Sequence, residues 1–415
     1  MTTGQTTSGR YQVILVLLLS LNFGVLFFDR NALNFLMPYV QPDLKLSFSQ
    51  VGLLSSALSF TWALSGIFIG AWSDRAGRKK VFIVLAGVAF SICSLMSGIA
   101  TSFLMLFGAR LLMGAAEGAV MPISHSLVAE AVSPERRGLG MGVAQNLGSN
   151  FLGSFVAPVV LTVFAATFGW RHAFFLAGVP GLICAALIWF YVKEPERDAS
   201  AVHDRLTFVT ALKYRNMVLC ALISILLVSY LVITWAFMPL FLTQVRHFDP
   251  KTTGWLMGTL GLSATLGSFV VPAISDRVGR RPVMILIPFL GLMIPFGAMY
   301  LGGSAWALVP LFFLGWALNG IFPLFMATIP SETIPARYVA TAVGFVMGLG
   351  EVLGGVFSPA IAGRAADLWS LSAVMWILAG LAVLAGILGM GLHETAPGKR
   401  RSALSDSVEL SPTPV

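Results

Sequence analysis

Charged residues are scarce in this 415-residue sequence, in which they make up only 11% of the chain. Soluble globular proteins carry about 25% charged residues, so an extensive water-exposed surface is excluded. Cysteine is also rare, and Cys93, Cys184 and Cys220 lie far apart in apolar stretches. Their spacing does not match that of metal ligands, and we expect all three to pack in the interior.

Enzyme motifs are missing as well. The sequence shows no phosphate-binding loop, no metal-ligand cluster and no paired nucleophile and base. We therefore expect neither catalysis nor a bound cofactor or metal, and a transmembrane proton gradient is the expected source of energy. The polar start, residues 1–10, lacks the pattern of a cleaved signal peptide.

Long apolar runs dominate the chain. Hydrophobic residues make up 57% of it, and the mean hydropathy is +0.85. Each run is close to the roughly 20 residues that cross a bilayer as a helix, and the runs alternate too little for barrel strands. We predict an all-α integral membrane protein with twelve transmembrane helices, at 13–40, 50–72, 80–98, 103–130, 137–167, 171–193, 217–243, 252–273, 281–302, 304–330, 337–367 and 370–392.

Basic residues are distributed unevenly around these spans. If both termini are cytoplasmic, 19 of the 26 Lys and Arg residues fall in cytoplasmic segments and 5 in external ones, while Arg30 and Arg110 lie within spans. Cytoplasmic loops of membrane proteins carry such an excess. The net charge of +8 therefore encodes orientation in the inner (plasma) membrane, with cytoplasmic termini, rather than a nucleic-acid partner.

The second half of the chain repeats the first. Segment 70–79, Gly-Ala-Trp-Ser-Asp-Arg-Ala-Gly-Arg-Lys, returns at 272–281 as Pro-Ala-Ile-Ser-Asp-Arg-Val-Gly-Arg-Arg, and Glu130 and Glu332 share the offset of 202. Such a repeat indicates duplicated units. We predict a tail (1–12), a six-helix bundle (13–193), a linker (194–216), a second six-helix bundle (217–392) and a second tail (393–415), with two pseudo-symmetric halves enclosing a substrate site near the midplane.

Segment 70–79 resembles the signature between helices 2 and 3 of the major facilitator superfamily, and the resemblance extends over essentially the whole chain. In that family the cluster latches the two halves in the outward-open state, and Gly70 would let a neighbouring helix approach closely. The resemblance implies a gating role for Gly70, Asp74, Arg75, Arg78, Glu130, Arg136, Asp276 and Arg277. The alternative is that these charges only set the topology.

The first and fourth predicted spans together hold two acids and two bases at membrane depth: Asp29 and Arg30 in the first, Arg110 and Glu117 in the fourth. An ionised side chain at membrane depth costs about 2.5–3.5 kcal/mol. At the repeat offset, the second half carries uncharged residues opposite three of them, namely Leu231, Phe312 and Asn319. The four charges are therefore interpreted as functional, and structural salt bridging between helices 1 and 4 is the alternative.

Helical spacing relates these residues to one another. Arg110 and Glu117 are seven apart, which places them on one face about 10 Å apart along the axis, and Gly114 between them is expected to open space. Asp29 and Arg30 differ by about 100° around helix 1, so at most one points straight into a central cavity. Further candidates are Glu351 and His125 for proton handling, and Asn22, Asn34, Gln145, Asn146, Asn150 and Asn319 for the cavity lining. Trp62 is expected to be a packing residue.

The pattern Arg110-x-x-x-Gly114-x-x-Glu117, together with Asp29-Arg30, resembles the anion:cation symporter family within that superfamily, which includes sugar-acid carriers, sialin and vesicular glutamate transporters. The resemblance implies that Arg30 and Arg110 hold a substrate carboxylate and that Asp29 and Glu117 take protons. Phe27 and Phe28 stand where many members have a tyrosine, and an expected asparagine in helix 11 is not evident, although Glu351 lies nearby. The scarcity of hydroxyls favours an acid smaller or more apolar than a polyol acid.

Charge balance suggests how transport and protons are coupled. Two arginines and two carboxylates sum to zero, so a bound substrate carboxylate leaves an unfavourable net charge in a low dielectric, and one proton restores neutrality. We predict a proton-coupled symporter of a small organic anion that works by alternating access, as a monomer in the lipid bilayer.

Two rival functions remain open. The first is a proton-driven drug or cation exporter, although helix 5, with Gly148 and Pro158, lacks the Gly-Pro-centred motif of antiporters, and two arginines repel a cation. The second is a non-transporting membrane sensor, although the polar tail 399–415 is too short to suggest a signalling domain.

Overall fold

The computed structural model describes residues 9–133, 137–194, 213–335 and 339–396, and every regular element in these ranges is a helix. The all-α fold predicted from hydropathy is therefore confirmed. Eleven helical segments in the described ranges are long and apolar enough to cross a membrane. α2 (Phe48–Ala76), with 29 residues, covers the remaining predicted span, 50–72.

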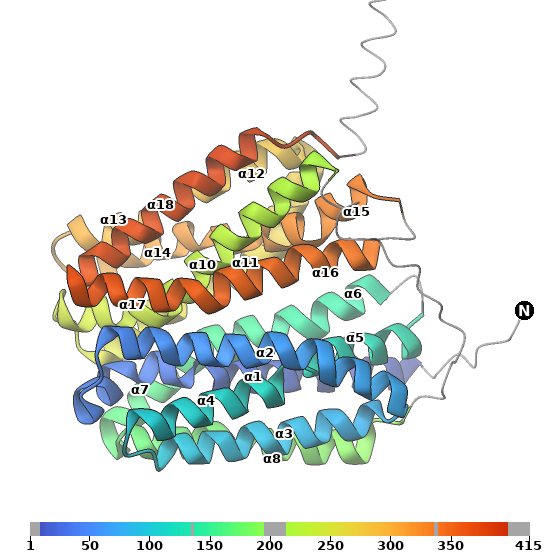
Figure 1. Cartoon of the computed structure of the whole chain (residues 1–415), viewed down its shortest axis with the longest axis horizontal. Coiled ribbons are helices and arrows are strands. Elements are labelled where there is room, and N and C mark those ends of the chain that lie inside the picture. Colours follow the sequence, from blue (N-terminus) through green and yellow to red (C-terminus); the bar gives the residue numbers. More distant parts are fainter. Residues whose placement is uncertain (1–8, 134–136, 195–212, 336–338, 397–415) are drawn as a thin grey trace, which may run out of the picture.

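The first half of the chain forms one bundle, in the lower part of Figure 1. Besides α2, its elements are α1 (Gly9–Leu44), α3 (Lys79–Gly98), α4 (Phe103–Glu117), α5 (Val120–Ala131), α6 (Arg137–Gly142), the π-helical η1 (Val143–Leu147) and η2 (Ser149–Val156), α7 (Ala157–Phe168) and α8 (Trp170–Tyr191). α4 and α5 belong to one span, Phe103–Ala131, which is interrupted directly after Glu117.

The second half forms the upper bundle of Figure 1. Its longer helices are α10 (Arg215–Gln244), α11 (Pro250–Val278), α12 (Arg280–Leu290), α16 (Val339–Leu349), α17 (Ser358–Leu368) and α18 (Leu371–Met390), and its shorter elements are α13 (Met293–Tyr300), α14 (Leu308–Gly315), η4 (Trp316–Ile321), η5 (Leu324–Thr328), α15 (Ile329–Thr333) and the π-helical η7 (Gly350–Phe357). α1 and α10 begin two residues or more before the predicted spans, and the described chain continues past α18 to Ala396.

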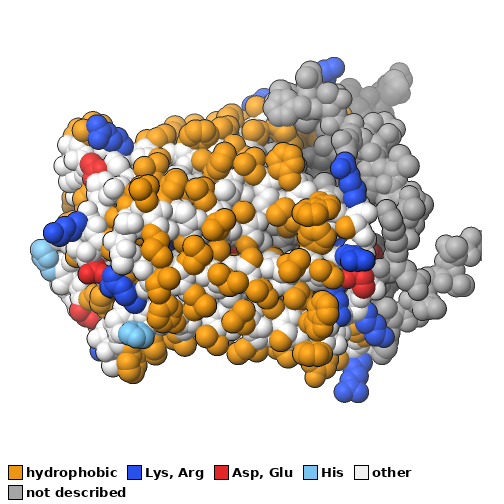
Figure 2. Space-filling view, turned by 60° about the horizontal axis from the view of Figure 1, so that its bottom comes forward, with side chains coloured by type: hydrophobic (Ala, Val, Ile, Leu, Met, Phe, Trp, Pro, Cys, Tyr) orange, Lys and Arg blue, Asp and Glu red, His pale blue; other side chains and the backbone are white. Residues whose placement is uncertain are grey.

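The surface of the molecule matches a lipid environment. Figure 2 shows apolar side chains over the middle of the flank and charged side chains gathered at the two ends. Large apolar side chains such as Phe68, Leu104 and Phe190 are mostly exposed. A contiguous apolar surface of this extent is normal for a chain solvated by hydrocarbon and not for one in water.

The two ends of the bundle are distinguished by the chain. We call the end at which α1 and α10 begin and α8 and α18 finish the linker end, and the end that carries the turn between α1 and α2 the turn end. Most packing between the halves involves α1, α2, η2 and α7 on one side and α10, α11, η7 and α17 on the other. At the linker end, α5 and α6 of the first half and α15 and α16 of the second pack extensively only within their own halves.

Closely packed glycines join the halves near the turn end. A Cβ on Gly52 of α2 would lie 2.1 Å from the carbonyl oxygen of Pro359 on α17, and one on Gly363 would lie 2.3 Å from that of Phe48. The Asp367 carboxylate of α17 accepts the backbone N–H groups of Phe48 and Ser49 at 2.9 and 2.8 Å. The described structure is therefore closed between the halves at the turn end.

Candidate functional site

Three of the four predicted intramembrane charges lie inside the N-terminal bundle. Asp29 of α1 and Arg110 and Glu117 of α4 are 0%, 2% and 1% exposed. One Asp29 oxygen accepts a hydrogen bond from Ser94 of α3 at 2.5 Å, and Arg110 Nη1 donates to the Arg30 carbonyl at 3.0 Å. The three charges interact electrostatically with one another and with the Cys93 thiol of α3.

No ion pair within 4.0 Å joins these groups to each other or to Arg30 among the described residues. The second oxygen of Asp29, both oxygens of Glu117, and Nε and Nη2 of Arg110 have no hydrogen-bond partner in that part of the chain. Direct salt bridging between helices 1 and 4 is therefore not what the geometry shows. Buried polar atoms without protein partners are uncommon and mark places where water, a proton or a ligand acts.

Arg30 points in a different direction from its neighbour Asp29. Its side chain is half-buried, and the guanidinium lies 5.2 Å from the ring centre of Trp62 on α2 and 5.5 Å from that of Phe27. It interacts electrostatically with Glu117 and with Glu351 of η7, which belongs to the other half. Arg30 therefore lies between the halves, and Asp29 lies inside one of them. Trp62, expected to be a packing residue, holds a charged side chain.

Gly114 does not open space as expected. A Cβ at this position would lie 2.2 Å from the carbonyl oxygen of Leu58 and 2.3 Å from the hydroxyl of Thr61, both on α2, and a Cβ on Gly118 would lie 2.1 Å from the Trp62 carbonyl oxygen. The two glycines instead let α4 pack directly against the backbone of α2. Sequence spacing correctly put Gly114 on a packed stripe, but the space it leaves is filled by the neighbouring helix.

The predicted amides and the histidine are only partly brought together. Gln145 of η1 interacts with His125 of α5 through their side chains, and Asn22 is 1% exposed in the interior. Asn34, Asn146, Asn150 and Asn319 are half-buried, and no described side-chain hydrogen bond links them to the charges. Arg110 is also less accessible than its predicted role as a substrate ligand suggests.

Two polar clusters occupy the linker end. In the first half, Lys79 pairs with Glu130. In the second half, Arg280 pairs with Asp276 at 2.5 Å and with Glu332 at 3.0 Å, and it is 7% exposed. Arg75, Arg78 and Arg277 are exposed. The side chains of Gly70, Asp74 and Arg136 lie outside the described residues.

The buried cation of the second cluster is thus Arg280, whereas Arg277, for which a gating role is predicted, is exposed. Lys79 and Arg280 are not among the residues predicted to gate, although both are in the repeated segment. Their partners, Glu130 and Glu332, are the acids that share the repeat offset. Matching the acids to every base of the repeat would have found both pairs.

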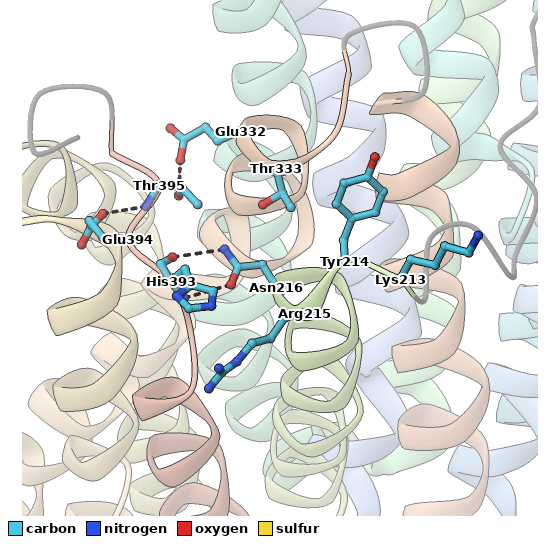
Figure 3. A pocket seen from close by; sticks show the side chains of 9 residues that line it. All are labelled: Lys213, Tyr214, Arg215, Asn216, Glu332, Thr333, His393, Glu394 and Thr395. Carbon is cyan, nitrogen blue, oxygen red and sulfur yellow. Dashed lines mark hydrogen bonds between the residues drawn. The ribbon is translucent and has the colours of Figure 1, made fainter. Parts of the chain in front are cut away.

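A cavity of about 360 Å³ lies beside the second cluster, lined by Lys213, Tyr214, Arg215, Asn216, Glu332, Thr333, His393, Glu394 and Thr395. Figure 3 shows Asn216 exchanging two hydrogen bonds with the backbone of His393, and Thr395 donating to Glu332. The Glu394 carboxylate accepts the N–H groups of Arg280, Arg281, Thr395 and Ala396. Burial acts to raise the pKa of Glu394, but these N–H donors outweigh it and hold the pKa below its usual value.

Residues 393–395, which open the predicted tail 393–415, are hydrogen-bonded to the bundle. The N-terminal half has a similar contact, in which the Glu194 carboxylate accepts the backbone N–H of Lys80 at 3.2 Å. Both acids follow the last span of their half. The acids of this cavity are already hydrogen-bonded. The candidate functional site is therefore the group of intramembrane charges, Asp29, Arg30, Arg110 and Glu117. Among the described residues, no group of three His, Cys, Asp or Glu side chains is placed to hold a metal.

Apolar membrane-spanning helices arranged in two halves, with charged side chains buried within the spans, are the architecture of a membrane carrier. Residues 19–353 match the Major Facilitator Superfamily, and the chain belongs to that family. It is therefore a multi-pass membrane transporter and not an enzyme.

Its relatives include several transporters. The chain is 30% identical to the "Probable 4-methylmuconolactone transporter" of Cupriavidus pinatubonensis, over 79% of this chain and 78% of the relative. It is 29% identical to the "Hexuronate transporter" of Bacillus subtilis, over 90% and 92%, and 25% identical to "Multidrug resistance protein 2" of the same organism, over 86% and 90%. The crystal structure of the nucleoside transporter NupG shares the fold, with a TM-score of 0.69 and 16% identity, over 91% of this chain and 98% of that one.

Proposed function

We propose that the chain is a proton-coupled symporter of a small organic anion, with a carboxylate bound at Arg30. The observation that carries this proposal is the way Arg30 is held. Its guanidinium lies over two aromatic rings and donates no described hydrogen bond. A cation–π contact uses the face of the guanidinium, so its N–H groups stay available for a carboxylate, which guanidinium binds in a bidentate manner.

The position of Arg30 suits a substrate that is reached from either side in turn. Arg30 interacts with acids of both halves, Glu117 and Glu351, and alternating access rocks one half against the other around such a site. In this proposal the termini lie in the cytoplasm of a bacterial cell, so that the turn end, at which the halves are closed, is the external end. The linker-end pairs, including Lys79 with Glu130 and Arg280 with Glu332, would then rearrange when the halves close there.

Proton coupling follows from the unpaired acids. Asp29 and Glu117 are buried beside Arg110 without a direct ion pair, so a carboxylate that draws on the positive charge of Arg30 favours protonation of one of them. Anion and proton then strengthen each other's binding. The relatives named for a hexuronate and a muconolactone support an organic-anion substrate, whereas the multidrug relative keeps a proton-driven exporter as the second candidate.

The test uses proteoliposomes that enclose a pH dye and are challenged with a panel of organic acids and cationic drugs. We expect one acid class to acidify the lumen and Arg30→Gln to abolish the response. Glu117→Gln should keep exchange of labelled for unlabelled acid while losing acidification. Alkalinisation by cationic drugs, with silence from every acid, would establish the exporter instead and contradict the symporter.

A further inference from the structure

Unpartnered polar atoms in the N-terminal bundle fall into two tiers. The first tier consists of the atoms of Asp29, Arg110 and Glu117 described above. The second consists of both amide atoms of Asn22 on α1, the hydroxyl of Ser124 and Nε2 of His125 on α5, none of which has a partner among the described residues. Asn22 and Ser124 are 1% and 0% exposed, in an otherwise apolar region.

The two tiers are stacked toward the linker end. α1 runs from the linker end to the turn end, and α4 and α5 run the opposite way. Asn22 precedes Asp29 by seven residues and Ser124 follows Glu117 by seven, and seven residues of helix span about 10 Å. Asn22 is therefore displaced toward the linker end from Asp29 on its own helix, and Ser124 is displaced in the same direction from Glu117 along the span that contains α4 and α5.

The helix that carries Asn22, α1, packs against α5, which carries Ser124. Asn22 belongs to a buried stripe of α1 in which Leu19 and Leu26 lie on either side of it. Leu19 packs in one apolar cluster with Ile123 and Leu127, and Leu26 packs in another with Val120. The residues that flank Asn22 along α1 thus belong to the same apolar clusters as residues on either side of Ser124 along α5.

Buried polar groups are satisfied by protein or by water, and a buried water usually has two to four polar partners. We propose that Asn22 and Ser124 hold a chain of water that carries protons between the Asp29–Glu117 acids and the linker end. This inference rests on the proposed symport function. It separates two routes, because substrate reaches Arg30 between the halves while protons leave through the interior of the N-terminal half.

Each group has a defined part in proton release. The O–H bond of a protonated Glu117 or Asp29 breaks, the proton passes along hydrogen-bonded water, and the His125 imidazole receives it at Nε2 before releasing it to water at the linker end. Asn22 takes no proton and orients the water with one donor and one acceptor group. Arg30, Arg110 and the Cys93 thiol are the other titratable groups that interact with the acids, and no electron is transferred.

The experiment compares wild type with Asn22→Leu, which keeps the number and branching of the side-chain heavy atoms but cannot hydrogen-bond, and with Asn22→Ser, which restores a polar group. Exchange of labelled for unlabelled acid requires no net proton release, whereas net uptake does. We expect Asn22→Leu to keep wild-type exchange and to lose net uptake and lumen acidification by about tenfold or more, since positioned proton transfer contributes at least that much. Asn22→Ser should recover most of the loss.

Ser124→Ala provides an independent arm if Asn22→Leu does not fold, and it should show the same split between exchange and net uptake. Unchanged acidification in the folded variants would overturn the proposal. A parallel loss of exchange and net uptake would also overturn it, because Asn22 would then serve folding or substrate binding. Failure of the wild type to transport any organic acid would instead refute the proposed function itself, so the two failures are distinguishable.

Discussion

The cation–π contact between Arg30 and Trp62 leads to a prediction for variants of Trp62. A cation–π contact contributes about 0.5–2 kcal/mol, which corresponds to about 2- to 30-fold in affinity. We expect Trp62→Leu to raise the KM for the organic anion by a factor in this range with a smaller change in kcat, since the ring positions Arg30 and does not take part in the movement of the halves. Uptake kinetics in proteoliposomes would measure both constants.

Trp62→Phe is the matched control, because it keeps a ring face and should stay within a fewfold of wild type. Equal KM values for the Leu and Phe variants would show that the ring serves packing, which was the expectation from sequence. Trp189, which lies 5.1 Å from the Lys80 ammonium at the linker end, offers a second aromatic residue whose replacement should leave KM unchanged.

Single residues also show how far sequence reasoning extends. The identity and depth of Asp29, Arg30, Arg110 and Glu117 were predictable, because buried charge is costly wherever it occurs. The directions in which these side chains point were not predictable. Asp29 and Arg30 are adjacent, so at most one of them can face the other half, but the sequence does not indicate which. The burial of Arg280 and the contact of Arg30 with Trp62 depend on contacts between segments far apart in the chain. Residue types alone do not determine such contacts.

At the scale of elements, backbone N–H groups at the start of α2 donate hydrogen bonds to side chains of both halves. Ser47 and Gln50 form a capping box within α2, and Asp367 of α17 accepts the next two N–H groups, those of Phe48 and Ser49. A lost cap costs about 0.5–2 kcal/mol, and the Asp367 cap exists only while the halves are closed at the turn end. We expect Asp367→Ala to shift the population toward the state that is open at that end.

Spin labels on His172 and Lys251, exposed residues near the starts of α8 and α11, would report this shift as a longer distance component in double electron–electron resonance. Ser47→Ala is the control, because it weakens the same helix start in both states and should leave the distance distribution unchanged. The idea would fail if both variants gave the same distribution as wild type.

The segment after α18 gives a prediction about pH. The pKa of Glu394 is lowered in the folded protein, so its stabilising effect is present above the unfolded value, about 4.3, and is lost as pH falls through the lower folded value. Glu394→Gln should therefore lower the unfolding temperature at pH 7, and the difference from wild type should shrink toward pH 3. Thermal unfolding of the purified transporter in detergent would measure it.

Glu194→Gln is a matched comparison, because Glu194 accepts one described N–H group where Glu394 accepts four. Its effect should be smaller at pH 7. A Glu394→Gln difference that stayed constant from pH 7 to pH 3 would show that shape, and not charge, makes the contribution.

Hydropathy predicted where helices run but not where they are interrupted. The break after Glu117 and the π-helical η1, η2 and η7 fall in glycine-containing stretches where neighbouring helices approach closely. A Cβ on Gly148 would lie 1.8 Å from the carbonyl oxygen of Ser20 on α1. Such local changes of helical pitch arise from packing partners, so a pattern that assumes a uniform helix cannot show them.

For the whole molecule, the repeat and its exceptions have different physical origins. Ion pairs at the linker end occur in both halves, between Lys79 and Glu130 and between Arg280 and Glu332, because each half needs its helices held together. The central charges do not recur, because one binding site serves both halves. The repeat was visible in the sequence, whereas the choice of which end is closed was not, since a carrier populates both arrangements with the same residues.

The charge of the whole centre determines how transport responds to voltage. Arg30 and Arg110 carry two positive charges, and Asp29, Glu117 and Glu351 carry three negative charges when ionised. The binding site is therefore neutral when it holds one proton and no substrate. When it holds a monocarboxylate, it is neutral with two protons bound. If both states cross the membrane uncharged, which low dielectric favours, each cycle moves one proton with one anion. Uptake driven by a pH gradient should then be indifferent to a potassium diffusion potential imposed with valinomycin.

The Glu351→Gln variant tests whether the number of protons transported per anion depends on the number of acids in the binding site. It removes one carboxylate from both the empty and the loaded states, so the difference between them remains one proton, and uptake should stay electroneutral even if its pH dependence changes. Acceleration of uptake by an inside-negative potential in the wild type would mean more than one proton per anion, and one of the two states would have to cross the membrane carrying charge.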